Sequence, residues 1–117
     1  MSVNLAVVRG TCSRPCEVRT LASGSTLAQL HLTARVDDEA AISVPVVVWD
    51  PKPAVTDLDV GDEVVVLGRV RRRFYQSGGG TASRTEVEAL SVVPAGNRRR
   101  VEALVRRASD ALDALIA

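Results

Sequence analysis

The sequence predicts a mainly β fold, a small five-stranded closed barrel followed by a C-terminal amphipathic α-helix. Three observations support this prediction. Five segments separated by turn residues show the alternating or continuously apolar pattern of strands. The one helical stretch between them contains two prolines and has room for a single turn. Residues 97–117 then change to the helical spacing of apolar residues.

The first two strands are expected in the N-terminal third of the chain. The first covers residues 3–12, with Gly10 at a bulge or a point of close approach, and extended chain resumes over residues 17–21. The second covers residues 26–36 and alternates cleanly between two faces. Its core-facing residues are expected to be Ala28, Leu30, Leu32 and Ala34.

The remaining strands follow a short acidic loop. Residues 42–50 form an almost wholly apolar third strand, in which Pro45 should limit pairing to one side. One helical turn is expected around residues 54–58, and the fourth and fifth strands cover residues 64–75 and 82–93. Five strands with a short helix between the third and fourth are typical of the oligonucleotide/oligosaccharide-binding barrel, the OB fold.

The last segment, residues 97–117, is expected to be a helix capped by Asn97 and set apart from a barrel of residues 1–94. Because an isolated helix of this length is marginal in water, its apolar stripe must be buried. The stripe either docks on its own barrel or pairs with a neighbouring subunit's helix. Pairing with a neighbour is favoured, because the two faces of the barrel sheet are already expected to serve the core and the binding surface. The stripe consists of Val101, Leu104, Val105, Ala108, Leu112, Leu115 and Ile116.

The fourth strand carries arginine at every second position and ends in aromatic residues. Its two faces therefore differ, since successive side chains of a strand point to opposite sides. Arginines bind phosphates and aromatic rings stack on bases, so the polar face is typical of a single-strand nucleic-acid binder. Phe74 has the parity of the apolar face and is expected in the core or in an interface. The polar face consists of Arg69, Arg71, Arg73 and Tyr75, and the apolar, core-facing side of Val64, Val66 and Val70.

Three further residues are candidates for the same nucleic-acid interface. Arg84 on the fifth strand is a candidate phosphate ligand. Arg35 joins it if the polar face of the second strand lies on the same side. Trp49, at the end of the third strand, either stacks on a base or plugs one end of the barrel.

The length and net charge of the chain limit the classes of protein to which it can belong. A chain of 117 residues is one domain that can form a core without disulfides or metals. The net charge of +1 gives no global basic field, so any attraction for nucleic acid must come from clustered cations. No signal peptide and no apolar stretch of membrane-spanning length is recognisable, so a cytoplasmic location is expected.

Catalytic and metal-binding patterns are not recognisable. Cys12 and Cys16 are expected to be reduced thiols, and His31 alone does not complete a metal site with them. No nucleophile–base pair, phosphate-binding glycine loop or pair of carboxylates stands at a recognisable spacing. The sequence therefore predicts a binding protein with no cofactor and no enzymatic activity.

Three segments in order resemble the bacterial single-stranded DNA-binding protein family. They are residues 3–19, which end in Glu17-Val18-Arg19; residues 23–34, with Ser23-Gly24 and Leu32-Thr33-Ala34; and residues 61–87, with the arginine strand and Thr85-Glu86-Val87. The resemblance implies an oligomeric OB fold, a tetramer or dimer, that binds single-stranded DNA in replication, recombination or repair. It places Trp49 and Tyr75 at aromatic positions of the family.

The chain also departs from this family. Ser43 and the region of Asp38 stand where other stacking aromatics are expected, and the loop before the third strand is short. The acidic tail of the family is lacking, so recruitment of partners through it is not expected. The few aromatics, the trimmed loop and the low charge favour an alternative, an oligomeric or primosome-type OB-fold interaction protein with weak or no nucleic-acid binding.

Overall fold

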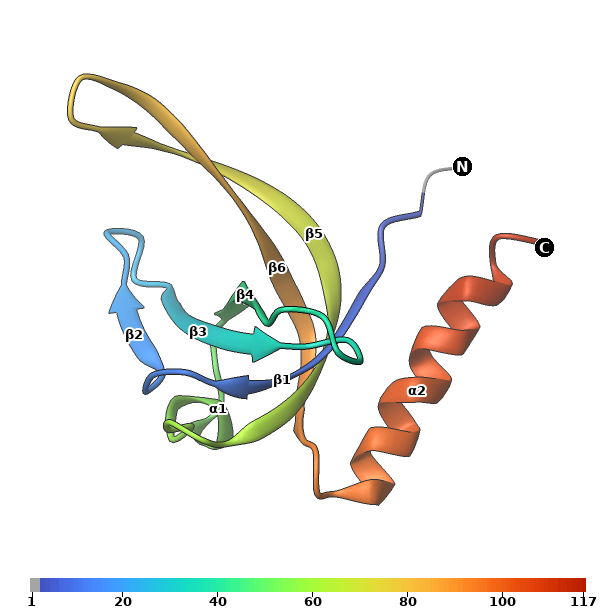
Figure 1. Ribbon diagram of the computed structural model, residues 1–117. Helices are drawn as coiled ribbons and strands as arrows, with labels where there is room; N and C mark the ends of the chain where they lie inside the picture. The colour runs from blue at the N-terminus through green and yellow to red at the C-terminus, as the bar shows by residue number, and fades with distance from the viewer. Residues whose placement is uncertain (1–2) are drawn as a thin grey trace.

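A single sheet of six strands closes on itself in the computed structural model, which describes residues 3–117 (Figure 1). The first two residues of the expected domain 1–94 lie outside the described residues. The sheet order is β1-β5-β6-β4-β3-β2, and additional pairing of β1 with β3 closes the barrel. The strands are β1 (Ala6–Cys12), β2 (Glu17–Thr20), β3 (Thr26–Ala34), β4 (Ile42–Trp49), β5 (Glu63–Ser77) and β6 (Gly80–Pro94), and the helices are α1 (Pro53–Thr56) and α2 (Arg98–Asp113).

The predicted mainly β barrel with a C-terminal helix is confirmed, with one strand more than expected. A bend over residues 13–16 separates β1 from β2, and both strands pair with β3 at different places. Pro45 pairs with His31 of β3, whereas β4 pairs with β6 only at Val46 and Val47. The missing amide of Pro45 therefore faces the side on which no ladder is formed, as the sequence predicted.

The barrel interior is filled by small aliphatic side chains. Ala28, Leu30 and Leu32 of β3 lie inside, where they meet residues of β4, β5 and β6. Ala34, which was also expected to face the core, is only half-buried at the end of the strand. Gly10 marks a close approach of strands, because a Cβ atom there would lie 2.9 Å from the backbone oxygen of Thr33. The interior cluster consists of Cys12, Ala28, Leu30, Leu32, Val46, Val55, Val64, Val66 and Val87.

The two strands of the β5–β6 hairpin have 15 residues each, against 7 to 9 in β1, β3 and β4, and the hairpin projects beyond the barrel, away from α2 (Figure 1). This projection makes one prediction wrong. Val64 and Val66 are buried, but Val70 is 49% exposed because the strand has already left the barrel at that point. Phe74 is 66% exposed for the same reason, so it is not a core residue of the single chain.

Helix α2 begins at the predicted cap, where the Asn97 side chain accepts a hydrogen bond from the backbone N–H of Arg100. It packs against the outer side of β5 and β6 through Leu104, Ala108 and Val101, which meet Val65, Leu67 and Val93. Part of the apolar stripe is thus buried against its own barrel. The other four stripe residues are exposed, namely Val105, Leu112, Leu115 and Ile116.

Within the part of the chain that the structure describes, no helix combines the length and the apolar character that crossing a membrane requires.

Candidate nucleic-acid interface

The arginines of β5 lie over a pair of buried glutamates on the outer face of the barrel. Arg69 Nε and Nη2 donate to Glu88 Oε1 at 2.9 and 2.5 Å, and Arg71 Nη1 donates to Glu88 Oε2 at 2.5 Å. Arg73 Nε lies 3.8 Å from Glu86 Oε1. The register explains these contacts, because Arg69 is directly opposite Glu88 in the β5–β6 ladder, whereas Arg71 and Arg73 reach Glu88 and Glu86 on the diagonal.

These ion pairs orient the arginines without using all of their donors. The guanidinium groups of Arg69 and Arg71 remain about half exposed above a Glu88 side chain that is nearly buried. A guanidinium has five N–H donors, so each can hold a carboxylate and still present donors to a phosphate. The face is therefore rigid and polar, with part of its positive charge compensated.

Glu88 is ionised more easily than an ordinary carboxyl group. Hydrogen bonds from Arg69 hold its pKa below the usual value, helped by those from Arg71 and Trp49 and opposed by burial. The negative charge is therefore kept at all physiological pH values, and the arginines above it stay in place.

The lowered pKa predicts an acid-dependent loss of stability that involves Glu88. The folded state favours the ionised carboxylate, so its contribution is present above the ordinary pKa of 4.5 and lost as pH falls through the lower folded-state value. Replacing Glu88 with Gln should lower the free energy of unfolding by about 1 kcal/mol at pH 7, because its partners are partly solvated. In urea titrations, the gap between wild type and variant should shrink toward pH 3; a constant gap would contradict the proposed ion pairs.

Trp49 forms one wall of a hollow beside the arginines. Its indole Nε1 donates to Glu88 Oε2 at 3.4 Å, and its side chain is 39% exposed. The hollow has a volume of about 170 Å³, an apolar floor of Leu27 and Val47, and a rim of Arg19, Arg71 and Arg73. The ring is neither buried nor a plug of the barrel end, and it leaves an accessible aromatic surface next to cations.

The other predicted site residues lie at increasing distances from this hollow. Arg84 is opposite Arg73 in the ladder and shares its face. Tyr75 lies farther along the projecting hairpin, opposite Ala82, and is 45% exposed. Arg35 is separate, because it lies just after β3 around another hollow with Arg9, Thr11 and Thr33. The structure brings Trp49, Arg69, Arg71, Arg73 and Arg84 together and leaves Arg35 outside.

Sequence reasoning missed three residues of this face. Glu86 and Glu88 alternate on β6 just as the arginines alternate on β5, and this matching spacing was the available signal. Arg19 of β2 comes from a distant part of the chain, and no local pattern marks it. Five arginines (19, 69, 71, 73 and 84) against two glutamates leave three uncompensated positive charges on the face.

The cysteines and the histidine do not form a site. Cys12 and Cys16 are free thiols, and burial raises the pKa of both, so they stay protonated near neutral pH. His31 Nε2 lies 3.3 Å from Glu17 Oε1, and burial lowers the pKa of the imidazole. Within residues 3–117, no group of three potential metal ligands is placed to hold an ion.

Comparison with solved structures identifies similar folds. The chain superposes on the single-stranded DNA binding protein from Thermus aquaticus with a TM-score of 0.63 for the wild type and 0.65 for a deletion mutant, at 22% sequence identity in each case. The match covers 79% of this chain and 40% of the Thermus chains, so it spans about two fifths of their length. No family model and no curated protein matches the sequence. The likeness shows the fold, an OB-type barrel.

Proposed function

We propose that the protein binds single-stranded DNA without sequence preference, through stacking of bases on aromatic rings and contacts of arginines with phosphates. The observation that supports this most strongly is the hollow walled by Trp49 and rimmed by Arg19, Arg71 and Arg73. An accessible ring and three arginines line the same hollow there, which is the combination that a base and its flanking phosphates need. The fold that the chain shares with the Thermus single-stranded DNA binding protein supports the same proposal.

In this proposal a base lies against Trp49 while the flanking phosphates meet the rim arginines. Every base has an aromatic face, so stacking tolerates any sequence. The strand then continues along β5, over Arg73 and Arg84 toward Tyr75, whose ring gives a second stacking surface on the hairpin. A role in replication, recombination or repair in the cytoplasm belongs to the same proposal.

Replacing Arg71 with Ala tests the phosphate contacts. The variant should bind oligo-dT more weakly, and the slope of log K against log salt should fall by about 0.7, the value for one phosphate contact to a single strand. Fluorescence anisotropy of a labelled oligonucleotide over a salt series measures both. Arg72, on the opposite face of β5 and opposite Thr85, gives a matched control, and an Arg72→Ala variant should keep the wild-type slope. Equal slopes in both variants would remove Arg71 from the interface.

A second candidate function is favoured by the compensation of the arginines. Three of the five arginines on the face already pair with Glu86 or Glu88, which lowers their attraction for phosphate. Such a face suits an OB-fold interaction protein that binds nucleic acid weakly or not at all. The two functions differ in whether oligo-dT binds at moderate salt.

We also propose that the protein forms a homo-oligomer, a dimer or tetramer. Val105, Leu112, Leu115 and Ile116 of α2 are exposed in the single chain, as is Phe74 on the hairpin. A neighbouring subunit that covered them would bury the part of the stripe that the barrel leaves in solvent. The expected pairing of helices between subunits therefore stays a prediction for this part of α2.

A further inference from the structure

A second hollow lies between the barrel and the first turn of α2, and Trp49 is also part of its lining. Its volume is about 230 Å³, and its walls come from the end of β4, from α1, from β6 and from α2. Trp49 lines both this hollow and the arginine-rimmed one. The two hollows therefore meet at this residue.

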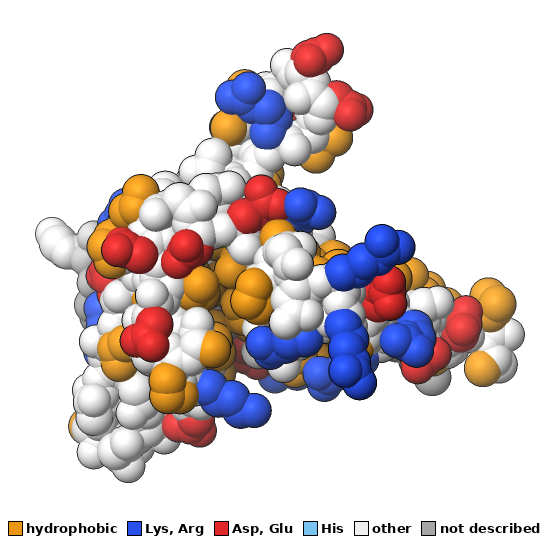
Figure 2. Space-filling model, turned by 90° about the horizontal axis from the view of Figure 1, so that it is seen from below, with side chains coloured by type: hydrophobic (Ala, Val, Ile, Leu, Met, Phe, Trp, Pro, Cys, Tyr) orange, Lys and Arg blue, Asp and Glu red, His pale blue; other side chains and the backbone are white. Residues whose placement is uncertain are grey.

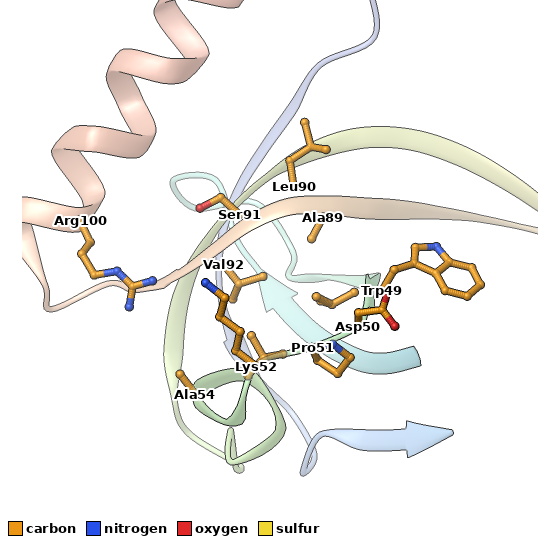
Figure 3. Close-up of a pocket in the computed structure, with 12 residues that line it drawn as sticks. Trp49, Asp50, Pro51, Lys52, Ala54, Ala89, Leu90, Ser91, Val92 and Arg100 are labelled. Atoms are coloured by element: carbon orange, nitrogen blue, oxygen red, sulfur yellow. The ribbon is translucent and has the colours of Figure 1, made fainter. Parts of the chain in front are cut away.

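Two cations extend into the second hollow from opposite sides. Lys52 comes from the turn before α1 and Arg100 from the first turn of α2, and Figure 3 shows both side chains directed into the space between these elements. Within residues 3–117, neither side chain takes part in an ion pair. Asp50 is the one acidic lining residue, so the lining has an excess of one positive charge.

The positive surface continues along α2. A third hollow shares Ser91 and Arg100 with the second and adds Arg107 from the next turns of the helix. In the view from below, Lys and Arg side chains gather on the side of the molecule that carries α2 (Figure 2). The side chains of Arg100 and Arg107 supply the cations that α2 contributes to this surface.

We propose that the bound single strand continues past Trp49 into this second hollow, where Lys52 and Arg100 bind its phosphates and Arg107 extends the path. This inference rests on the proposed function and adds a segment of strand and a role for α2. Unlike Arg69 and Arg71, which Glu88 partly neutralises, Lys52 and Arg100 have their full charge available. They should therefore contribute more to the salt dependence of binding than the arginines of β5.

The test compares a short and a long oligonucleotide on a Lys52→Gln/Arg100→Gln variant. Oligo-dT of about 4 and about 16 nucleotides spans the range of OB-fold site sizes. In this proposal the short strand binds at the first hollow, where the arginines of β5 and β2 surround the ring, and only the long strand reaches Lys52 and Arg100. The variant should bind the short strand like the wild type. For the long strand it should lose roughly tenfold in affinity, with a salt slope lower by about 1.4 for two lost phosphate contacts.

An Arg72→Gln/Arg106→Gln variant is the matched control. It also removes two positive charges, but neither residue lines the second hollow. It should bind both strands like the wild type. An equal loss in both variants would mean that net charge alone matters and would overturn the inference, as would an unchanged affinity of the Lys52→Gln/Arg100→Gln variant for the long strand.

Two further outcomes distinguish the longer strand path from a failure of DNA binding as a whole and from a site for a small anion. If the wild type binds neither oligonucleotide, the proposed function fails and the inference fails with it. Inorganic phosphate tests the hollow as a site for a free anion. An increase in melting temperature with millimolar phosphate that is lost in the Lys52→Gln/Arg100→Gln variant would assign the hollow to a small anion and overturn the strand path.

Discussion

Replacing Trp49 with Ala should weaken the binding of single-stranded DNA by about 1–3 kcal/mol, the loss typical of one stacked base. This corresponds to a decrease of roughly 5- to 150-fold in affinity at 25 °C. The effect should be large because Trp49 lines both hollows and its indole also donates to Glu88. Removing the ring takes away the stacking surface and one support of the carboxylate that orients Arg69 and Arg71.

Anisotropy of a labelled oligo-dT strand measures this loss without relying on the tryptophan signal. A Trp49→Phe variant should recover most of the affinity, since a smaller ring still stacks. A Phe74→Ala variant removes an exposed ring from the face of β5 opposite to that of Arg71 and Arg73, and it should bind like the wild type. If Trp49→Ala also keeps wild-type affinity, bases do not stack at this position and the proposed interface is wrong.

Replacing Gly68 with Ala should destabilise the fold by about 3 kcal/mol. A Cβ atom at this position would lie 2.3 Å from the backbone oxygen of Glu88 and 2.9 Å from Val87 Cγ1. No side-chain rotation relieves a contact with a backbone oxygen, so β5 and β6 would have to separate where the ladder shifts its register. The same separation would displace Glu88 from Arg69, so the loss of stability should be accompanied by weaker DNA binding.

Urea denaturation followed by circular dichroism measures the change in the free energy of unfolding. Gly96→Ala is the control, because a Cβ atom there meets nothing within 4 Å. That control should stay within about 0.5 kcal/mol of the wild type. A Gly68→Ala variant of equal stability would show that the two strands are less closely paired at the bulge than the structure has them.

The sequence predicted the elements well, because each has a local signal. Alternation identified the core-facing side of β3, where Ala28, Leu30 and Leu32 are buried. Asn97 marked the beginning of α2, and the two prolines limited α1 to one turn. These signals depend only on residues close together in the chain, so they can be read without knowing the tertiary structure.

The sequence did not predict the features that depend on contacts between segments far apart in the chain. Alternation assigned Val70 to the apolar face of β5, but not whether the barrel extends far enough to cover it. The pairing of Glu88 with Arg69 depends on the strand register, and the register includes a bulge that no local pattern indicates. The sequence also did not indicate how the α2 stripe divides, with Leu104 packed on the barrel and Leu112 and Ile116 exposed.

The position of Arg35 illustrates the limit of face assignments in a closed barrel. Its parity is that of Leu27 and Gln29, which lie near the Trp49 end of β3. The sheet curves between them, so residues on the same side of one strand point to different regions of the surface. Arg35 therefore belongs with Thr11 and Arg9 near β1, and among residues 3–117 its hollow shares no lining residue with the hollow at Trp49.

The most direct test of the proposed function is a titration of the wild-type protein with oligo-dT, followed by the fluorescence of Trp49. This residue is the only tryptophan of the chain, so its signal reports on the hollow itself. We expect quenching on binding, an affinity that falls between about 50 and 200 mM salt, and values for dT, dC and mixed strands within about tenfold. Duplex DNA should bind far more weakly, since its bases are not free to stack. The proposed function would be contradicted by the absence of both binding and quenching at about 50 mM salt, or by equal affinity for duplex and single strands.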